Sequence, residues 1–242
     1  MDGHFLRDVY TAKKQGGKIM IEITGLYQSY KDKNVLNNIN LIIEKNEHCA
    51  LVGRNGAGKS TLIHSMLGLL PVKKGSIQLG GYSHKKGEWK KIVSYLPEKF
   101  HLYPHLTGEE NMRFFASLSS KEIDEKKMEE KLRLVSLWDD RHHQIKGYSK
   151  GMLQRLGLGV MLYYDTDILI LDEPTSGLDP IGRKEVLDIL KSLSGKTILM
   201  SSHHMDEIKQ TCTNVAFLNE GTIIKYTVDD FMSNHLQEVG KK

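Results

Sequence analysis

After a short apolar run, His48–Val52, the chain reads Gly53-Arg54-Asn55-Gly56-Ala57-Gly58-Lys59-Ser60-Thr61. These residues fit G-x-x-x-x-G-K-[S/T] and precede a segment that predicts a helix from about Lys59 to Leu69. Small residues let the backbone curl around a phosphate, and the N–H groups at a helix start attract anions. We expect all nine residues to bind a nucleotide, with Lys59 reaching the β- and γ-phosphates and Ser60 holding Mg²⁺.

A second motif begins with four apolar residues, Ile168–Leu171, and continues with Asp172 and Glu173. The apolar run predicts a buried strand, and ligands of open parallel sheets bind at the C-terminal ends of strands. Asp172 is expected to orient Mg²⁺, and Glu173 to polarise an attacking water as a general base. Taken alone, a solvated acidic turn is the better interpretation; behind a phosphate loop, the catalytic interpretation is favoured.

The apolar patterns around these motifs indicate the architecture. Residues 20–43 alternate as antiparallel strands around a turn at 31–34. Residues 98–163 change to helical patterns, including a charged amphipathic helix over 121–138. Strands and helices then alternate, which favours a mostly parallel sheet covered by helices. We expect an α/β fold of the P-loop NTPase type, with an antiparallel β subdomain and an α-helical subdomain inserted at about 98–163.

Length and composition set further limits. The 242 residues carry a formal net charge of +4, which is too weakly positive to predict a nucleic-acid partner. The two cysteines, Cys49 and Cys212, predict no disulfide framework and suit a reducing cytoplasm. The sequence contains no run of about 18 apolar residues, so it predicts no membrane-spanning helix. Residues 1–19 are expected to form a disordered extension, with Met20 an alternative start, and residues 227–242 a C-terminal tail.

Over residues 20–226, the chain resembles the nucleotide-binding domains of ABC (ATP-binding cassette) systems. Six elements of that family follow one another in the family's order. The resemblance implies that His203 is the switch histidine that contacts the γ-phosphate, so that it joins Glu173 and Lys59 in catalysis. It also implies that Tyr30 stacks on adenine, with Tyr27 as a rival, and that Asp179 belongs to the loop that communicates between subunits.

The resemblance also assigns a signature segment, Ser149, Lys150 and Gly151. Ser149 begins a predicted helix, so its hydroxyl and the first backbone N–H groups lie at the positive end of the helix dipole. In the family, that end faces the γ-phosphate bound by the opposite subunit. This implies a homodimer, or a dimer with a sister ATPase chain, that depends on ATP. Without the resemblance, these residues would suit a capped surface helix.

Two departures from the family pattern are present. The usual signature Leu-Ser-Gly-Gly-Gln is replaced by Tyr-Ser-Lys-Gly-Met at residues 148–152, and the glutamine expected after Tyr95-Leu96-Pro97 is Glu98. A carboxylate offers oxygen ligands, so we expect Glu98 to meet Mg²⁺ beside Ser60 and Asp172. Both departures resemble the ATPases of ABC-2-type exporters.

The resemblance therefore implies an ATPase that uses ATP and Mg²⁺ and drives a separate transmembrane permease. It would lie at the inner face of the cell membrane, as a cytoplasmic, peripheral protein of an exporter. In residues 98–110, Phe100, Tyr103 and Leu106 suit either permease contacts or packing within the helical lobe. The alternatives are a soluble ABC ATPase that acts on the ribosome or DNA, and a cassette that binds ATP as a sensor with little turnover.

Overall fold

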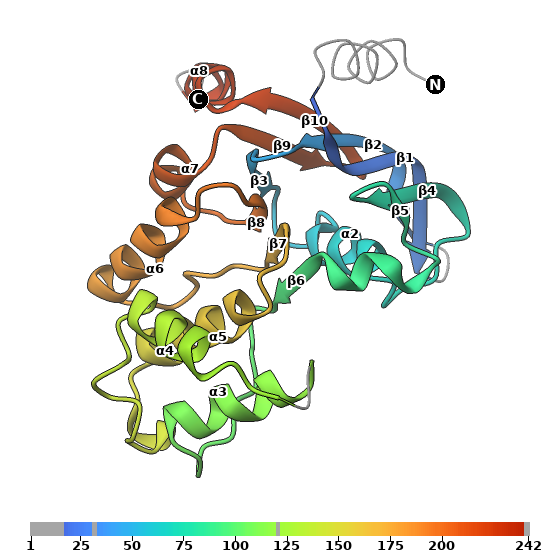
Figure 1. The fold of residues 1–242 in the computed structure, drawn as a ribbon. Coiled ribbons are helices and arrows are strands. Elements are labelled where there is room, and N and C mark those ends of the chain that lie inside the picture. Colours follow the sequence, from blue (N-terminus) through green and yellow to red (C-terminus); the bar gives the residue numbers. More distant parts are fainter. Residues whose placement is uncertain (1–16, 31–32, 120–121, 240–242) are drawn as a thin grey trace. The chain divides into compact units, whose positions relative to one another are not determined.

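The computed structural model describes residues 17–30, 33–119 and 122–239 and divides the chain into two compact units (Figure 1). The first unit contains the chain up to Val93, residues 167–170 and residues 195–242. The second contains residues 94–166 and 171–194, and includes the region 98–163 in which helices are expected. Most of the predicted extension, residues 1–16, lies outside the described residues, and a strand already begins at Ile19.

An antiparallel sheet forms part of the first unit. It consists of β1 (Ile19–Tyr30), β2 (Lys33–Glu44), β4 (Lys74–Leu79) and β5 (Tyr82–Ser83), in the order β2-β1-β4-β5. Ile21 pairs with Ile43, and both side chains are buried. Gly75 takes a φ of 95° and lies against the backbone of Gly25, where a side chain would have no room. The predicted antiparallel β region is confirmed.

The second sheet has six strands in the order β10-β9-β3-β8-β7-β6. Their bounds are β3 (His48–Val52), β6 (Val93–Leu96), β7 (Ile168–Leu171), β8 (Thr197–Ser201), β9 (Asn214–Asn219) and β10 (Thr222–Thr227). β3 runs parallel to both β8 and β9, and β10 is antiparallel to β9. β7 and β8 are buried along their whole length, as expected for strands covered on both faces. The α/β class is confirmed.

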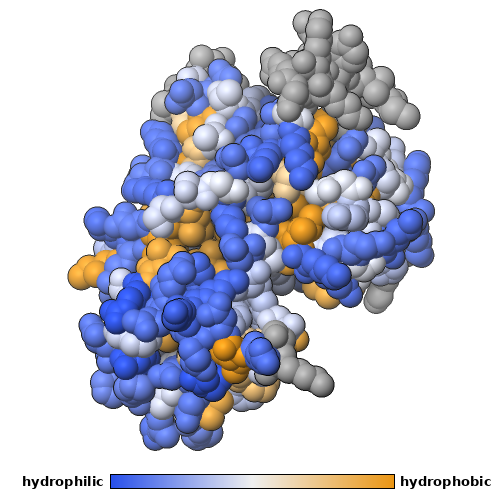
Figure 2. All heavy atoms as spheres, viewed as in Figure 1, coloured by the Kyte–Doolittle hydropathy of each residue, from blue (hydrophilic) through white to orange (hydrophobic). Residues whose placement is uncertain are grey.

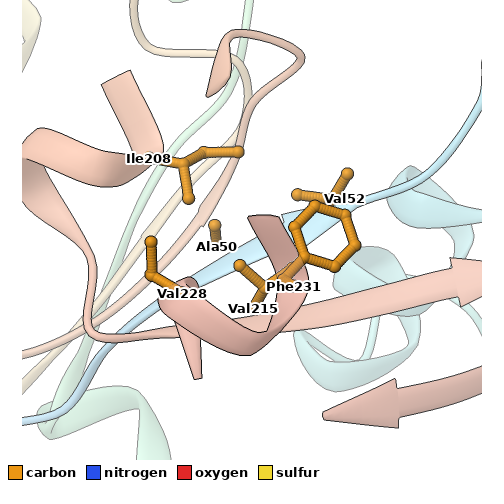
Figure 3. Close-up of a cluster of buried hydrophobic side chains, with 6 residues drawn as sticks. All are labelled: Ala50, Val52, Ile208, Val215, Val228 and Phe231. Atoms are coloured by element: carbon orange, nitrogen blue, oxygen red, sulfur yellow. The ribbon is translucent and has the colours of Figure 1, made fainter. Parts of the chain in front are cut away.

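Among the described residues, three α-helices belong to the first unit: α2 (Lys59–Met66), α7 (Met205–Thr211) and α8 (Val228–Val239). Figure 3 shows how the last two pack on the sheet: Ile208 of α7 and Val228 and Phe231 of α8 meet Ala50, Val52 and Val215. Residues 227–242 were expected to form a C-terminal tail, and within this stretch Val228–Val239 forms α8. Its apolar residues recur at helical spacing, and the sheet supplies the surface that buries them.

The second unit is helical around α5 (Lys150–Tyr163), which α3 (Gly108–Ser117), α4 (Glu125–Leu134) and α6 (Pro180–Ser192) contact. The helix predicted over 121–138 is too long. The Asp124 side chain caps α4 by accepting the Lys127 N–H at 3.0 Å, and Ser136 takes a φ of 53° just beyond its end. Within the described residues, none of the helices combines the length and the apolar character that crossing a membrane requires.

Candidate functional site

The phosphate loop lies between β3 and α2 in the first unit. Gly56 and Gly58 have φ values of 80° and 111°, a region that L residues rarely adopt. A side chain at Gly58 would lie 2.9 Å from Val35 Cγ1, and Gly53 lies against the Leu218 carbonyl with no room for a Cβ. The loop is therefore a cradle of backbone at a helix start, the geometry that binds phosphates.

Lys59 and His203 are 144 residues apart in the chain, and the fold brings them together. Lys59 is the first residue of α2 and is 8% exposed; its Nζ donates to the Gly53 carbonyl at 2.8 Å. His203 follows β8, the parallel neighbour of β3, so both residues leave the sheet at the same edge. The His203 Nε2 lies 3.4 Å from the Lys59 Nζ. Both groups can therefore serve one phosphate chain.

Two buried residues, Ser202 and Glu207, fix the loop that carries His203 by hydrogen bonds. Ser202 Oγ donates to Glu207 Oε2 at 2.9 Å and accepts the His204 N–H at 3.1 Å. Ser202 is 1% exposed and Glu207 2%. Neither residue was expected from the sequence, although an acidic residue in the first turn of α7 is a helix-start signal that points to this region.

The other predicted nucleotide contacts lie in the loop itself, in the first turn of α2 and on β1. Ser60 is exposed in the first turn of α2, and the Ala57 N–H donates to the Arg54 carbonyl at 3.0 Å within the loop. Tyr30 ends β1, and its side chain lies outside the described residues. The ring of its rival, Tyr27, is covered by the Lys74 ammonium 3.9 Å from the ring centroid.

The acidic residues lie in the second unit, just beyond β6 and β7. The Asp172 N–H donates to the Leu96 carbonyl at 2.9 Å, and Asp172 is 8% exposed. Burial, together with the nearby Asp172 charge, raises the pKa of Tyr95 to about 12. Glu98 is exposed two residues after β6. Asp172 follows β7 and Glu98 follows β6, and the hydrogen bond from Asp172 to Leu96 connects the C-terminal ends of these two strands.

Glu173 has an unusual backbone conformation. Its φ of 48° is uncommon for a residue other than glycine, and its carbonyl accepts the Ser176 N–H at 3.0 Å to form a turn. Such conformations persist where the surrounding structure imposes them, and they cluster at functional sites. The turn sets the direction in which the Glu173 carboxylate leaves the strand.

The signature segment forms the start of α5. Ser149 Oγ accepts the Met152 N–H at 3.1 Å, as a helix cap does, and Ser149 and Lys150 are exposed. Asp179 caps α6 in the same way and accepts the Gly182 N–H at 2.7 Å. A Cβ on Gly151 would lie 3.4 Å from the Gly182 Cα, so the two helix starts touch. The fold thus brings the predicted signature next to the helix that Asp179 caps. The contact is made through Gly182, which the sequence did not single out.

The sequence model of the family described as ABC transporter matches residues 36–176. The chain belongs to the ABC transporter family. YhcH of Bacillus subtilis (strain 168), an uncharacterized ABC transporter ATP-binding protein, is 36% identical over 213 residues, 86% of this chain and 69% of YhcH. SrtF of Streptococcus pyogenes, a lantibiotic transport ATP-binding protein, is 37% identical over 207 residues, 85% of this chain and 89% of SrtF.

A solved ATP-binding subunit of an ABC transporter has the same fold. It matches with a TM-score of 0.77 at 30% identity and covers 89% of this chain and 93% of its own length. Together with the family match, this makes the chain an ATP-binding and ATP-hydrolysing subunit of an ABC transporter. The backbone cradle at Gly53–Gly58 fits the triphosphate of ATP.

Proposed function

We propose that this ABC transporter subunit powers an exporter by binding and hydrolysing ATP between two cassettes. The observation that carries the proposal is the Lys59 ammonium, held between the Gly53 carbonyl and His203 at the mouth of a backbone cradle. A buried cation at a helix start suits the β- and γ-phosphates of a nucleotide. The likeness of residues 148–152 and of Glu98 to ABC-2-type exporters favours export, and SrtF, similar over most of its length, is a lantibiotic transport protein.

The predicted nucleotide-binding residues would contact the phosphates, the base and Mg²⁺. The nine residues 53–61 surround the phosphates, and Tyr30 stacks on the base. Ser60, Asp172 and Glu98 would hold Mg²⁺ through oxygen, the ligand type that this ion prefers. When bound, the ion neutralises the charge of the β- and γ-phosphate oxygens.

Hydrolysis is assigned to three residues. Glu173 accepts a proton from the water that attacks the γ-phosphate, and the turn at Glu173 fixes the carboxylate for this task. Lys59 and His203 place positive charge and a hydrogen-bond donor where negative charge develops. The phosphate bond to the leaving ADP breaks as the bond to water oxygen forms, and in-line attack needs no covalent intermediate.

The dimer supplies the rest of each site. Ser149, Lys150 and Gly151 of one chain would face the γ-phosphate bound by the other, and Asp179 would meet the partner near that contact. The exposure of Ser149, Lys150 and Asp179 supports this role, as does the 72% exposure of Ile181 beside Asp179. The second cassette is either another copy of this chain or a sister chain.

A separate permease is the proposed membrane partner, so the chain would lie at the inner face of the membrane. Tyr103 and Phe114 form an edge-to-face pair with centroids 4.7 Å apart and are 47% and 38% exposed; Leu118, on the same lobe, is 66% exposed. Phe100 packs on Phe115 at 5.1 Å. These side chains therefore both pack the lobe and leave apolar surface exposed for a partner. Figure 2 shows orange patches over the part of the molecule that contains α3.

The test is the Glu173→Gln variant, purified with Mg-ATP from gently solubilised native cells. Loss of the base should lower the ATPase rate by at least about a hundredfold while ATP binding remains. Mass spectrometry should find a polytopic membrane protein in stoichiometric amount. Lys59→Ala, which should lose ATP binding, is the matched control. Recovery of ribosomal or DNA-repair proteins without a membrane chain would overturn the transporter role and favour a soluble ABC ATPase.

A further inference from the structure

The positive charge of this chain is concentrated in one short segment. Residues 73–91 contain six lysines and a single acidic residue, Glu88. Without them, the chain's 34 basic and 30 acidic residues become 28 and 29, so the segment carries +5 and the rest −1. We call these six residues the lysine face: Lys73, Lys74, Lys85, Lys86, Lys90 and Lys91.

The fold gathers the lysine face on one part of the first unit. β4 and β5 form a hairpin in which Gln78 pairs with Ser83, and the His84 N–H donates to the Ile77 carbonyl at 3.0 Å. The chain then turns, because the Lys86 N–H donates to the Ser83 carbonyl at 3.0 Å, so Lys85 and Lys86 lie in the turn that follows the hairpin. Lys90 and Lys91 follow in the 3₁₀ helix η1 (Gly87–Lys91), which Trp89 anchors by donating to the His84 carbonyl at 2.9 Å.

The charges of the lysine face are open to a partner. All six side chains belong to exposed residues. Within the described part of the chain, no carboxylate forms an ion pair with any of them. Two lie near aromatic rings instead: Lys74 over Tyr27 at 3.9 Å and Lys90 over Trp89 at 6.0 Å. Neither contact neutralises the charge.

Exposed apolar side chains accompany the lysines. Tyr82 of β5 is 46% exposed and Leu69, after α2, is 63% exposed. Gly68 places this turn beside the Trp89 ring, since a Cβ there would lie 3.9 Å from it. Over β4 and β5, at the right of Figure 2, blue and pale surface predominates. Lysines with a few apolar neighbours suit the headgroup region of a membrane, where cations meet lipid phosphates and apolar tips reach toward the acyl chains.

We propose that the lysine face binds the anionic phospholipid headgroups of the membrane that holds the permease. The proposal rests on the proposed function, because the permease is what brings this chain to a membrane. A cluster of lysines close to an anionic surface strengthens attachment by roughly fivefold for each residue. The contact would hold the first unit at the bilayer independently of the permease contacts proposed for the helical lobe.

The test is sedimentation of the purified chain with sucrose-loaded vesicles, without a permease. We expect binding to phosphatidylcholine vesicles that contain about one-third phosphatidylglycerol and none to phosphatidylcholine alone. Raising salt from about 0.1 M to about 1 M should release the protein, since the Debye length falls from about 10 Å to about 3 Å. The variant Lys73→Gln, Lys74→Gln, Lys85→Gln, Lys86→Gln should bind several hundredfold more weakly, at roughly fivefold for each lysine removed.

The matched control removes the same charge elsewhere. Lys18, Lys45, Lys126 and Lys209 are exposed, and all four are changed to Gln together. The control should keep vesicle binding within about threefold of wild type, because screening confines the attraction to nearby charges. Equal loss in both variants, or no binding by wild type, would overturn the proposal.

Two further readouts separate this proposal from the proposed function. The ATPase rate of both lysine variants should equal that of wild type, which also shows that they fold. If the Glu173→Gln complex lacks a permease while wild type still binds anionic vesicles, the transporter role fails and the lipid contact stands. If the permease is recovered but vesicles are not bound, only the lipid contact fails.

Discussion

Ser202 shows how a single buried hydroxyl can support a residue that is proposed to contact the nucleotide, His203. Its Oγ accepts the His204 N–H and donates to Glu207. Ser202→Ala should therefore remove two hydrogen bonds that fix the position of the loop that carries His203. We expect kcat to fall about tenfold, the worth of one buried hydrogen bond, with KM nearly unchanged. Ser202→Thr should restore part of the rate. Thr197→Val removes an equally buried hydroxyl at the other end of β8, bonded to the Asn46 N–H, and should lower stability but not kcat. Equal kcat losses in both would contradict a positioning role.

At the scale of elements, Arg155 ties α5 to the end of α4. Its guanidinium donates to the Val135 and Ser136 carbonyls, both at 3.0 Å, and approaches Glu185 of α6 at 3.4 Å. A cation at a helix C-terminus satisfies carbonyls that the helix leaves without partners. Arg155→Ala should reduce the free energy of unfolding by about 3 kcal/mol in urea titrations. Arg133→Ala, which breaks an exposed pair with Glu129, should cost less than about 0.5 kcal/mol. Similar losses for the two variants would show that the α4 cap contributes little.

For the whole molecule, the decisive question is whether one chain completes the site of another. Lys59→Ala should disable the phosphate loop, and Ser149→Arg should block the signature segment; each variant alone should be inactive. In an equal mixture, half of the dimers pair one of each, and these keep one intact site. Activity should therefore recover to up to roughly a quarter of the wild-type rate. Mixing either variant with buffer is the control. No recovery would mean that loop and signature act within one chain.

The candidate site was predicted best where the structure depends on neighbours along the chain. The glycines of residues 53–58, the helix start at Lys59 and the cap at Ser149 are each set within about four residues. Glu173 was predicted as the base, yet its φ of 48° could not be read from the sequence. That conformation is imposed by the turn to Ser176, in which packing overrides the ordinary backbone preference.

The sequence by itself determined the order of strands and helices, the phosphate loop and the family, because periodicity and short motifs are local properties. Only the tertiary structure decided which distant residues meet. The approach of Lys59 to His203 and the packing of α8 on β3 and β9 both join distant segments through the sheet. The structure also contains a shorter helix than the one predicted over 121–138. The chain bends beyond α4, where the Arg155 guanidinium donates to the Val135 carbonyl. Such contacts depend on the burial of surfaces that the chain presents only once it has folded.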